Sequence, residues 1–322
     1  MRRALIVGID DYGSQSLKGC SNDAEEIKRL LSYHGDNNIN FQTVIRTGTV
    51  YKDELIELIK QCFVRDEDVA LFYFSGHGYI DEQGGYLVTS DFEIDDFGVS
   101  LQEVMDIANN SKCKNKIIIL DSCHSGFMGR DNDISPDATI ITNGVTILTA
   151  CIEQETALER GGHGVFTSLL IEALSGRAAD ILGHISVGSI YAYIDKALGP
   201  WDQRPVFKTN VSNFISLRNV NPPIDLVTLR KICTYFPDES YKYPLDPSYE
   251  PTNSEEYEHK LVKPYADIEN TQIFNDLQKF EGLGLVRPLN EEHMYYAAMN
   301  GDVCVLTSMG KRYWKLAKES KI

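Results

Sequence analysis

The residues best suited to do chemistry are a cysteine and a histidine that each follow a short apolar run. Cys123 comes shortly after Ile117–Leu120, and His77 comes shortly after Ala70–Phe74. A free thiol is mostly protonated at neutral pH, so a cysteine nucleophile needs a nearby imidazole to take its proton. Such runs are typical of buried strands, and active groups of open α/β sheets collect at the carboxyl ends of strands. The sequence therefore predicts a Cys/His pair at one edge of a parallel sheet.

Glycines lie close to both residues. Gly76 and Gly78 flank His77, and Gly126 follows Cys123. Glycine permits tight turns and a close approach of the backbone, so amide N–H groups can point at a developing oxyanion. We expect the N–H groups of Gly78 and Cys123 to be the donors.

The two segments resemble the catalytic boxes of a known family. Phe-Ser-Gly-His-Gly at 74–78 and Asp-Ser-Cys-His-Ser-Gly at 121–126 are similar to those of caspase-like cysteine peptidases, above all metacaspases and their bacterial relatives. The histidine lies about 50 residues before the cysteine, as in caspases. The Gln-Ala-Cys box of animal caspases is absent. Further likeness lies at 4–9, 17–24 and 164–170, so the resemblance as a whole covers about two thirds of the chain.

The resemblance also implies a substrate class. Metacaspase-like enzymes cut after Arg or Lys through an acidic pocket, and that pattern falls on Cys20, Asp23, Ser75 and Asp121. The residue types agree, because carboxylates in a desolvated slot can pair with a guanidinium. Like charge should exclude aspartate at the cleaved position. We expect protein substrates with exposed Arg or Lys.

Composition argues against several other classes of protein. The chain has 322 residues, a formal charge of −16 and a pI near 4.9, which argues against a general polyanion binder. Its seven dispersed cysteines favour reduced thiols in a cytoplasm over a disulfide framework. Met1–Arg3 leads into a first strand and not a signal peptide, and no apolar run has membrane-spanning length. We expect a cytoplasmic protein without a membrane partner.

Periodicity predicts an α/β fold. Apolar runs alternate with helical patterns, which indicates a caspase-like, mostly parallel sheet with helices on both faces at 1–218. A hairpin is expected at 79–89 around Gly84 and Gly85. The expected strands are 4–9, 41–45, 69–74, 116–120 and 145–149, and the expected helices are 21–31, 52–63, 101–109, 165–174 and 187–198.

The polar segment 127–138 carries no periodicity and predicts an exposed loop. In caspase-like enzymes the corresponding segment joins the large and small parts of the catalytic domain and can be cut during activation. Arg130 would match the expected cleavage preference, so self-cleavage after Arg130 is a hypothesis.

The remainder of the chain predicts a second domain. A Pro-rich connector with one helix at 225–235 is expected over 219–265, followed by a small α+β domain over 266–322. In that domain we expect a helix at 268–283, a strand pair at 294–298 and 303–307, and a terminal helix at 309–317. This order resembles a winged-helix module.

A winged helix binds nucleic acid or protein, and the fold alone does not choose. Lys311, Arg312, Lys315 and Lys318 give the last helix a basic face, but no other basic run reinforces it. We favour a regulatory protein partner over nucleic acid.

Each assignment has an alternative interpretation. A lone cysteine is usually buried packing, and only the paired boxes reverse that expectation for Cys123. His124 is an alternative base, but adjacent side chains of an extended backbone point apart. A zinc site formed by His77, Cys123 and His124 is disfavoured, because these residues do not have the sequence spacing of zinc ligands. No cofactor is expected, although many metacaspases need calcium and Asp91, Asp95 and Asp96 form an acidic cluster.

The sequence thus favours a cysteine endopeptidase that uses Cys123 and His77 and cuts after Arg or Lys. By analogy with bacterial caspase-like proteases, a stress, cell-death or defence role is expected. The main alternative is a catalytically idle caspase-like scaffold that assembles complexes through the winged helix. A transcription-type regulator fits the acidic chain poorly.

Overall fold

The computed structural model describes two compact units, Met1–Asn221 and Pro222–Ile322. The boundary follows Val220 and Asn221 and precedes the proline pair at 222–223. The described residues are 1–64, 66–94, 96–122, 141–150, 159–160, 163–199, 204–257 and 260–322.

The centre of unit 1 is a six-stranded sheet in the order β12-β8-β7-β3-β1-β2. Five strands run parallel, and β12 at one edge runs antiparallel to β8. β3 lies inside the sheet and is buried at every position, as its unbroken apolar run predicts. The strands are β1 (Arg2–Ile9), β2 (Gln42–Gly48), β3 (Val69–Ser75), β7 (Asn115–Asp121), β8 (Val145–Thr149) and β12 (Val206–Asn210).

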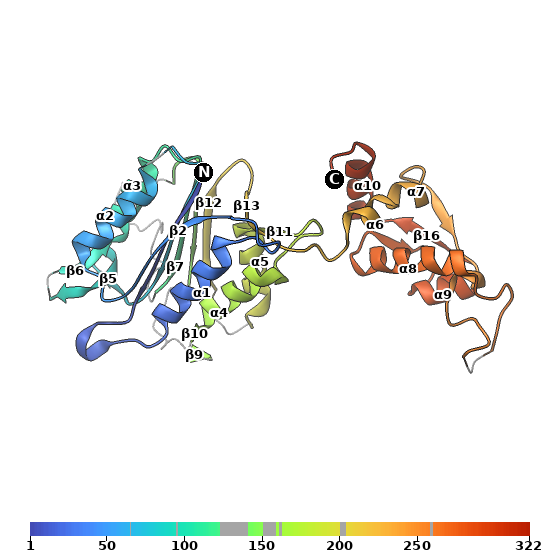
Figure 1. The fold of residues 1–322 in the computed structure, drawn as a ribbon, viewed down its shortest axis with the longest axis horizontal. Coiled ribbons are helices and arrows are strands. Elements are labelled where there is room, and N and C mark those ends of the chain that lie inside the picture. Colours follow the sequence, from blue (N-terminus) through green and yellow to red (C-terminus); the bar gives the residue numbers. More distant parts are fainter. Residues whose placement is uncertain are drawn as a thin grey trace. The chain divides into compact units, whose positions relative to one another are not determined.

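Helices cover both faces of this sheet (Figure 1). Side chains of a strand alternate between faces, so Leu5 and Val7 of β1 join one apolar cluster and Ala4 and Ile6 join the other. The first cluster is closed by α2 and α3, and the second by α1, α4 and α5. The predicted α/β fold, a mostly parallel sheet with helices on both faces, is confirmed. The helices are α1 (Cys20–Ser32), α2 (Lys52–Phe63), α3 (Leu101–Asn109), α4 (Val165–Glu172) and α5 (Val187–Ala197), and a short π-helical turn, η3 (Ala173–Arg177), extends α4.

Smaller sheets complete unit 1. The predicted hairpin is present, because β4 pairs antiparallel with β5 and a third strand, β6, pairs with β5. These short elements are the 3-10 turn η1 (Gly13–Gln15) and the strands β4 (Gly78–Asp81), β5 (Gly84–Glu93), β6 (Asp96–Ser100), β9 (Glu159–Arg160), β10 (His163–Gly164), β11 (His184–Ser186) and β13 (Ser216–Asn219).

Unit 2 is a three-stranded sheet, β14-β16-β15, with helices and an apolar core that includes Phe274, Phe280 and Trp314. The segment expected to be a connector contributes two short helices and the strand β14, which carries Pro244 at the edge of the sheet, where a missing N–H costs no ladder bond. The elements are α6 (Leu226–Arg230), α7 (Ile232–Tyr235), β14 (Lys242–Pro244), η4 (Pro247–Tyr249), α8 (Ile268–Gly282), β15 (Val286–Pro288), α9 (Met294–Met299), β16 (Val303–Leu306) and α10 (Ser308–Lys318).

The prediction of a strand at 294–298 is wrong, because this segment forms the helix α9. Met294, Ala297 and Ala298 are its buried residues, and their spacing of three and four fits one helical face. Gly301 has φ of 68° and lies just beyond the end of the helix, where a left-handed residue is common, instead of forming a hairpin turn with Asn300. The strand pair on which the winged-helix likeness rested does not form. β16 pairs with β15 and β14 instead.

Among the described residues, no helix combines the length and apolar character needed to cross a membrane.

Candidate active site

The two sequence boxes begin at neighbouring positions of the main sheet. β3 and β7 are adjacent parallel strands, and their register pairs Ser75 with Asp121 at the carboxyl edge. His77 and Cys123 each come two residues after one member of this pair. His77 is described and half-buried. Cys123, His124 and Arg130 lie outside the described residues.

The His77 imidazole has a fixed hydrogen-bond partner. Its Nε2 atom lies 2.8 Å from the backbone carbonyl oxygen of Gln15 in η1. A carbonyl oxygen only accepts, so this bond requires a proton on Nε2. In the neutral ring Nδ1 is then the unprotonated atom. The arrangement leaves Nδ1 able to accept a proton from a thiol.

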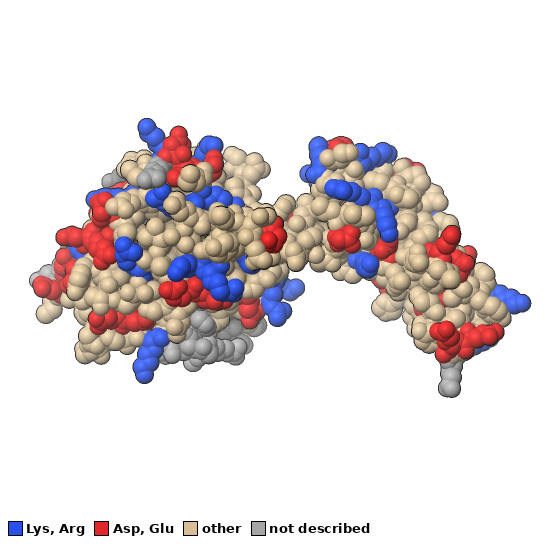
Figure 2. Space-filling model, in the orientation of Figure 1, with Lys and Arg blue, Asp and Glu red and all other residues tan. Residues whose placement is uncertain are grey.

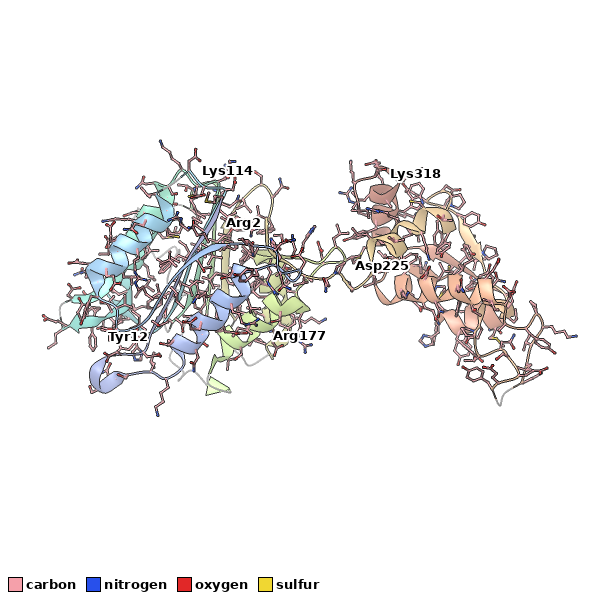
Figure 3. The ribbon with its side chains drawn as sticks, in the orientation of Figure 1. Arg2, Tyr12, Lys114, Arg177, Asp225 and Lys318 are labelled. Carbon is pink, nitrogen blue, oxygen red and sulfur yellow. The ribbon has the colours of Figure 1, made fainter. Side chains whose placement is uncertain are left out.

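Tyr12 holds the backbone of His77. Its hydroxyl accepts a hydrogen bond from the His77 N–H at 3.0 Å and donates to the Val88 carbonyl at 3.3 Å. Its ring lies 4.6 Å from the imidazole, centroid to centroid. Tyr12 is 2% exposed. It lies in the loop that follows β1 and is labelled in Figure 3. The tyrosine therefore bridges β5 and the start of β4.

Gly78 presents its N–H away from the hairpin partner. The Val88 N–H donates to the His77 carbonyl at 3.0 Å, which makes His77 and Val88 a hydrogen-bonded position of the β4–β5 ladder. Antiparallel positions alternate, so the next pair, Gly78 and Leu87, directs its N–H and C=O groups outward. This direction suits the predicted oxyanion donor.

Three of the four predicted pocket residues are buried. Cys20, Asp23 and Ser75 are 8%, 2% and 2% exposed, and the Ser75 hydroxyl donates to Asp23 Oδ2 at 3.1 Å. Burial raises the pKa of the Cys20 thiol to about 12, against a hydrogen bond with Ser75 that lowers it. The Cys20 thiol is therefore neutral at physiological pH.

Asp121 is the fourth member. Its Oδ2 accepts a hydrogen bond from Thr167 Oγ1 at 2.6 Å. The pKa of Asp121 is raised to about 6, mainly by burial of the carboxyl group and also by the negative charge of Asp23, whereas the hydrogen bonds from Thr167 oppose the shift. An added Cβ at Gly164 would lie 2.9 Å from Asp121 Oδ2, so glycine leaves room for this carboxylate. Asp23 and Asp121 therefore lie close enough for the charge of one to change the pKa of the other.

The first turn of α1 is fixed at the edge of the sheet. The Asp10 carboxylate accepts the N–H groups of Cys20 at 2.9 Å and Ser21 at 3.1 Å, which satisfies donors that a helix start leaves open. A Cβ at Gly8 would lie 2.1 Å from the Cys20 carbonyl oxygen, so β1 and α1 approach here only because position 8 is glycine. These contacts place Asp23 beside β3.

A search for similar proteins agrees with this geometry. The model of the peptidase C14 caspase domain matches residues 1–214. The chain belongs to the caspase-domain family. It is a cysteine-type peptidase, as the paired boxes predicted. A search of curated proteins returned no match.

In the acidic segment considered for calcium, the described carboxylates bond to Lys52. Asp96 forms an ion pair with Lys52 Nζ at 2.6 Å, and Asp91 accepts the Lys52 backbone N–H at 3.1 Å. Asp95 lies outside the described residues. Within the described part of the chain, no group of three or more His, Cys, Asp or Glu side chains is arranged to hold a metal ion. The two described carboxylates fit a calcium site poorly.

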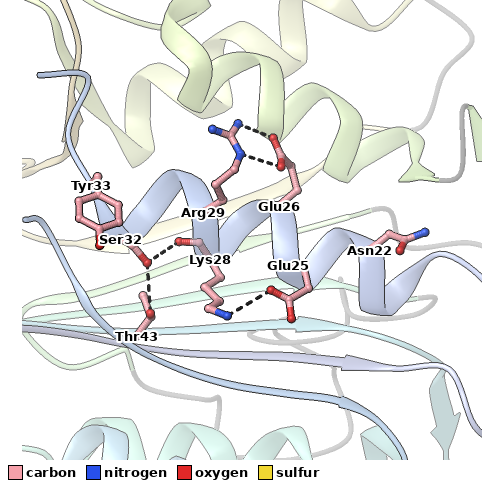
Figure 4. Close-up of a pocket in the computed structure, with 8 residues that line it drawn as sticks. All are labelled: Asn22, Glu25, Glu26, Lys28, Arg29, Ser32, Tyr33 and Thr43. Atoms are coloured by element: carbon pink, nitrogen blue, oxygen red, sulfur yellow. Dashed lines mark hydrogen bonds and ion pairs between the residues drawn. The ribbon is translucent and has the colours of Figure 1, made fainter. Parts of the chain in front are cut away.

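A surface groove of about 710 Å³ lies elsewhere on the caspase domain, along the outer face of α1 (Figure 4). Its charges are paired within the helix, Lys28 with Glu25 and Arg29 with Glu26. Such exposed pairs at spacing three are ordinary features of a helix surface. No predicted site residue among those described lines this groove.

Four residues that contact the site were missed from the sequence, namely Tyr12, Gln15, Tyr73 and Thr167. Gln15 acts through its backbone carbonyl, which leaves no side-chain signal. Thr167 lies in the segment 164–170 that resembles the family, and that likeness was the available clue. Tyr73 has the sequence pattern of an ordinary core aromatic, and Tyr12 lies in a short polar segment that gives no sign of burial.

Proposed function

We propose that this caspase domain is a cysteine endopeptidase that cuts after Arg or Lys, with Cys123 as nucleophile and His77 as base. One observation carries the proposal. The in-register strand ends that lead to His77 and Cys123 also hold Ser75 and Asp121, next to the buried Asp23. The two catalytic boxes and the predicted acidic pocket residues therefore start from the same edge of the sheet.

The proposed reaction uses the free nitrogen of His77. Nδ1 takes the proton of the Cys123 thiol, and the sulfur attacks the carbonyl carbon of the scissile bond. The N–H groups of Gly78 and Cys123 stabilise the oxyanion. His77 then gives its proton to the leaving amine. Water, activated by the same imidazole, hydrolyses the acyl-enzyme and regenerates the thiol.

The acidic pair supplies the specificity. A guanidinium or ammonium group beside Asp23 and Asp121 would relieve their mutual repulsion and replace the water that each carboxylate loses on burial. An aspartate side chain at the same position would add a third negative charge. The expected order is Arg or Lys far above Asp.

Fluorogenic peptides that end in Arg, Lys or Asp test this proposal on the full chain. Wild type should cleave the first two, and Cys123→Ala and His77→Ala should each lose about a thousandfold or more of kcat. Cys233→Ser, at a half-buried cysteine in unit 2, is the matched control and should keep full activity. Cleavage after Asp, or equal activity of Cys123→Ala and wild type, would overturn the proposal.

Thiol alkylation gives a readout that needs no substrate. Burial raises the pKa values of Cys20, Cys62 and Cys304 to about 12, so these thiols should resist iodoacetamide at neutral pH. Cys123 should be the first site modified, as read by peptide mass mapping. The rate should fall in His77→Ala if the imidazole activates the thiol.

The role of unit 2 is proposed as recognition of a regulatory protein in a bacterial stress, cell-death or defence response. Its α10 exposes Lys311, Arg312 and Lys315, and basic side chains gather over this end of the unit in Figure 2. Neighbouring Glu319 pairs with Lys315 and Lys321, which weakens the patch as a polyanion site. Tight, salt-sensitive binding of DNA or RNA by the full chain would contradict this role.

A further inference from the structure

Two buried hydroxyl groups lead from the core to Asp121. Thr167 lies in the first turn of α4, and Tyr73 lies on β3, and both are 0% exposed. The Tyr73 hydroxyl lies 2.7 Å from Thr167 Oγ1, which in turn lies 2.6 Å from Asp121 Oδ2. The three groups form an unbroken chain across three elements of unit 1.

The direction of the chain follows from counting protons. An ionised carboxylate only accepts hydrogen bonds, so the single hydroxyl proton of Thr167 must be donated to Asp121. Thr167 Oγ1 is then the acceptor toward Tyr73. Burial raises the pKa of Tyr73 well above its usual value, so the phenol stays protonated and donates. The Thr167 backbone N–H also bonds Asp121.

We infer that Thr167, supported by Tyr73, is a positioning residue that keeps Asp121 ionised and oriented toward a basic substrate side chain. This inference rests on the proposed function. The groups that face Asp121 are Asp23 and Cys20 from α1, Tyr73 from β3 and Thr167 from α4. Asp23 and burial both favour the protonated acid. The Thr167 donors favour the charged form, so without the hydroxyl a larger fraction of the carboxyl group would be neutral at pH 7.

Thr167→Val removes the hydroxyl and keeps the shape and the backbone N–H. For each variant, kcat/KM is measured from pH 5 to 9 for a peptide with Arg at the cleaved position and for its uncharged citrulline analogue. The ratio of the two cancels the titration of the dyad. Thr167→Val should move the midpoint of this ratio about one pH unit upward, and should therefore lower the ratio, through KM, about twofold at pH 7 and about tenfold at pH 5. Thr167→Ser restores a donor and should behave like wild type.

Tyr73→Phe is the second variant, and it covers the outcome that Thr167→Val does not fold. It should shift the midpoint in the same direction by a smaller amount, because Thr167 keeps its own donor. Ratios and midpoints equal to those of wild type in Thr167→Val, or in a folded Tyr73→Phe if the first variant fails, would refute the inference.

Thermal unfolding from pH 4 to 8 separates this inference from the proposed function. A carboxyl group whose folded pKa is raised contributes stability at low pH that is lost as pH rises through the folded pKa. In Thr167→Val this loss should continue to higher pH than in wild type, and Asp121→Asn should remove it. A wild type that does not cleave Arg peptides would sink the proposed function alone. Unfolding profiles of Thr167→Val and wild type that depend on pH in the same way would refute the inference about Thr167.

Discussion

The Nε2 atom of His77 and the carbonyl oxygen of Gln15 lie 2.8 Å apart. This contact fixes which nitrogen carries the proton, because the carbonyl cannot donate. A side chain at position 15 is not required for it. We therefore expect Gln15→Ala to keep near wild-type activity, whereas changes that move the backbone of η1 should not.

Tyr12→Phe should lower kcat about tenfold and leave KM within about twofold. The ring contact with His77 survives, but the bridge from the His77 N–H to the Val88 carbonyl is lost, at a cost of about 1 kcal/mol per hydrogen bond. Steady-state kinetics on an Arg peptide measure the split. Tyr33→Phe, at a half-exposed tyrosine on the far end of α1, is the control. A change confined to KM would show that Tyr12 does not act through the base.

Recognition of Arg should weaken in mild acid. The pKa of Asp121 is raised to about 6, so its charge is lost as pH falls below that value. The preference for Arg over citrulline should fall about tenfold between pH 7 and pH 5. Asp121→Asn should give a low preference that does not change with pH. A wild-type preference that stays constant down to pH 5 would contradict the assignment of this carboxylate to the pocket.

Asp23→Asn should raise KM for Arg peptides by about tenfold or more, because half of the acidic pair is removed. It should also lower the midpoint of the Arg preference, since Asp23 raises the pKa of Asp121. Glu25→Gln changes the same charge on the exposed face of the same helix and should leave both quantities unchanged. Equal effects of the two variants would indicate long-range electrostatics instead of contact.

Chelation of divalent cations should leave peptidase activity unchanged. Lys52 already neutralises Asp96 and its backbone N–H bonds Asp91, so a calcium ion would have to displace an ammonium group at 2.6 Å. The rate is measured with EGTA and again after calcium is restored. A calcium-dependent rate that Asp91→Asn abolishes would reinstate the acidic segment as a metal site.

Local patterns predicted the elements of unit 1 well. An apolar run such as Val69–Phe74 has one stable environment, the inside of a sheet, and amphipathic repeats such as Lys52–Phe63 have one buried face. The pattern failed in unit 2 at Met294–Ala298, where a short mixed run fits a strand or a helix equally well. Packing against the neighbouring strand decided between them.

The sequence by itself determined the chemistry available, because a thiol box and an imidazole box after two apolar runs are local features that survive without coordinates. It also determined the caspase-domain family of residues 1–214. Only the tertiary structure decided that Asp23, Ser75 and Asp121 lie close together and which nitrogen of His77 carries the proton. Those facts depend on strand register and on backbone groups such as the Gln15 carbonyl, and neither is encoded by any single residue type.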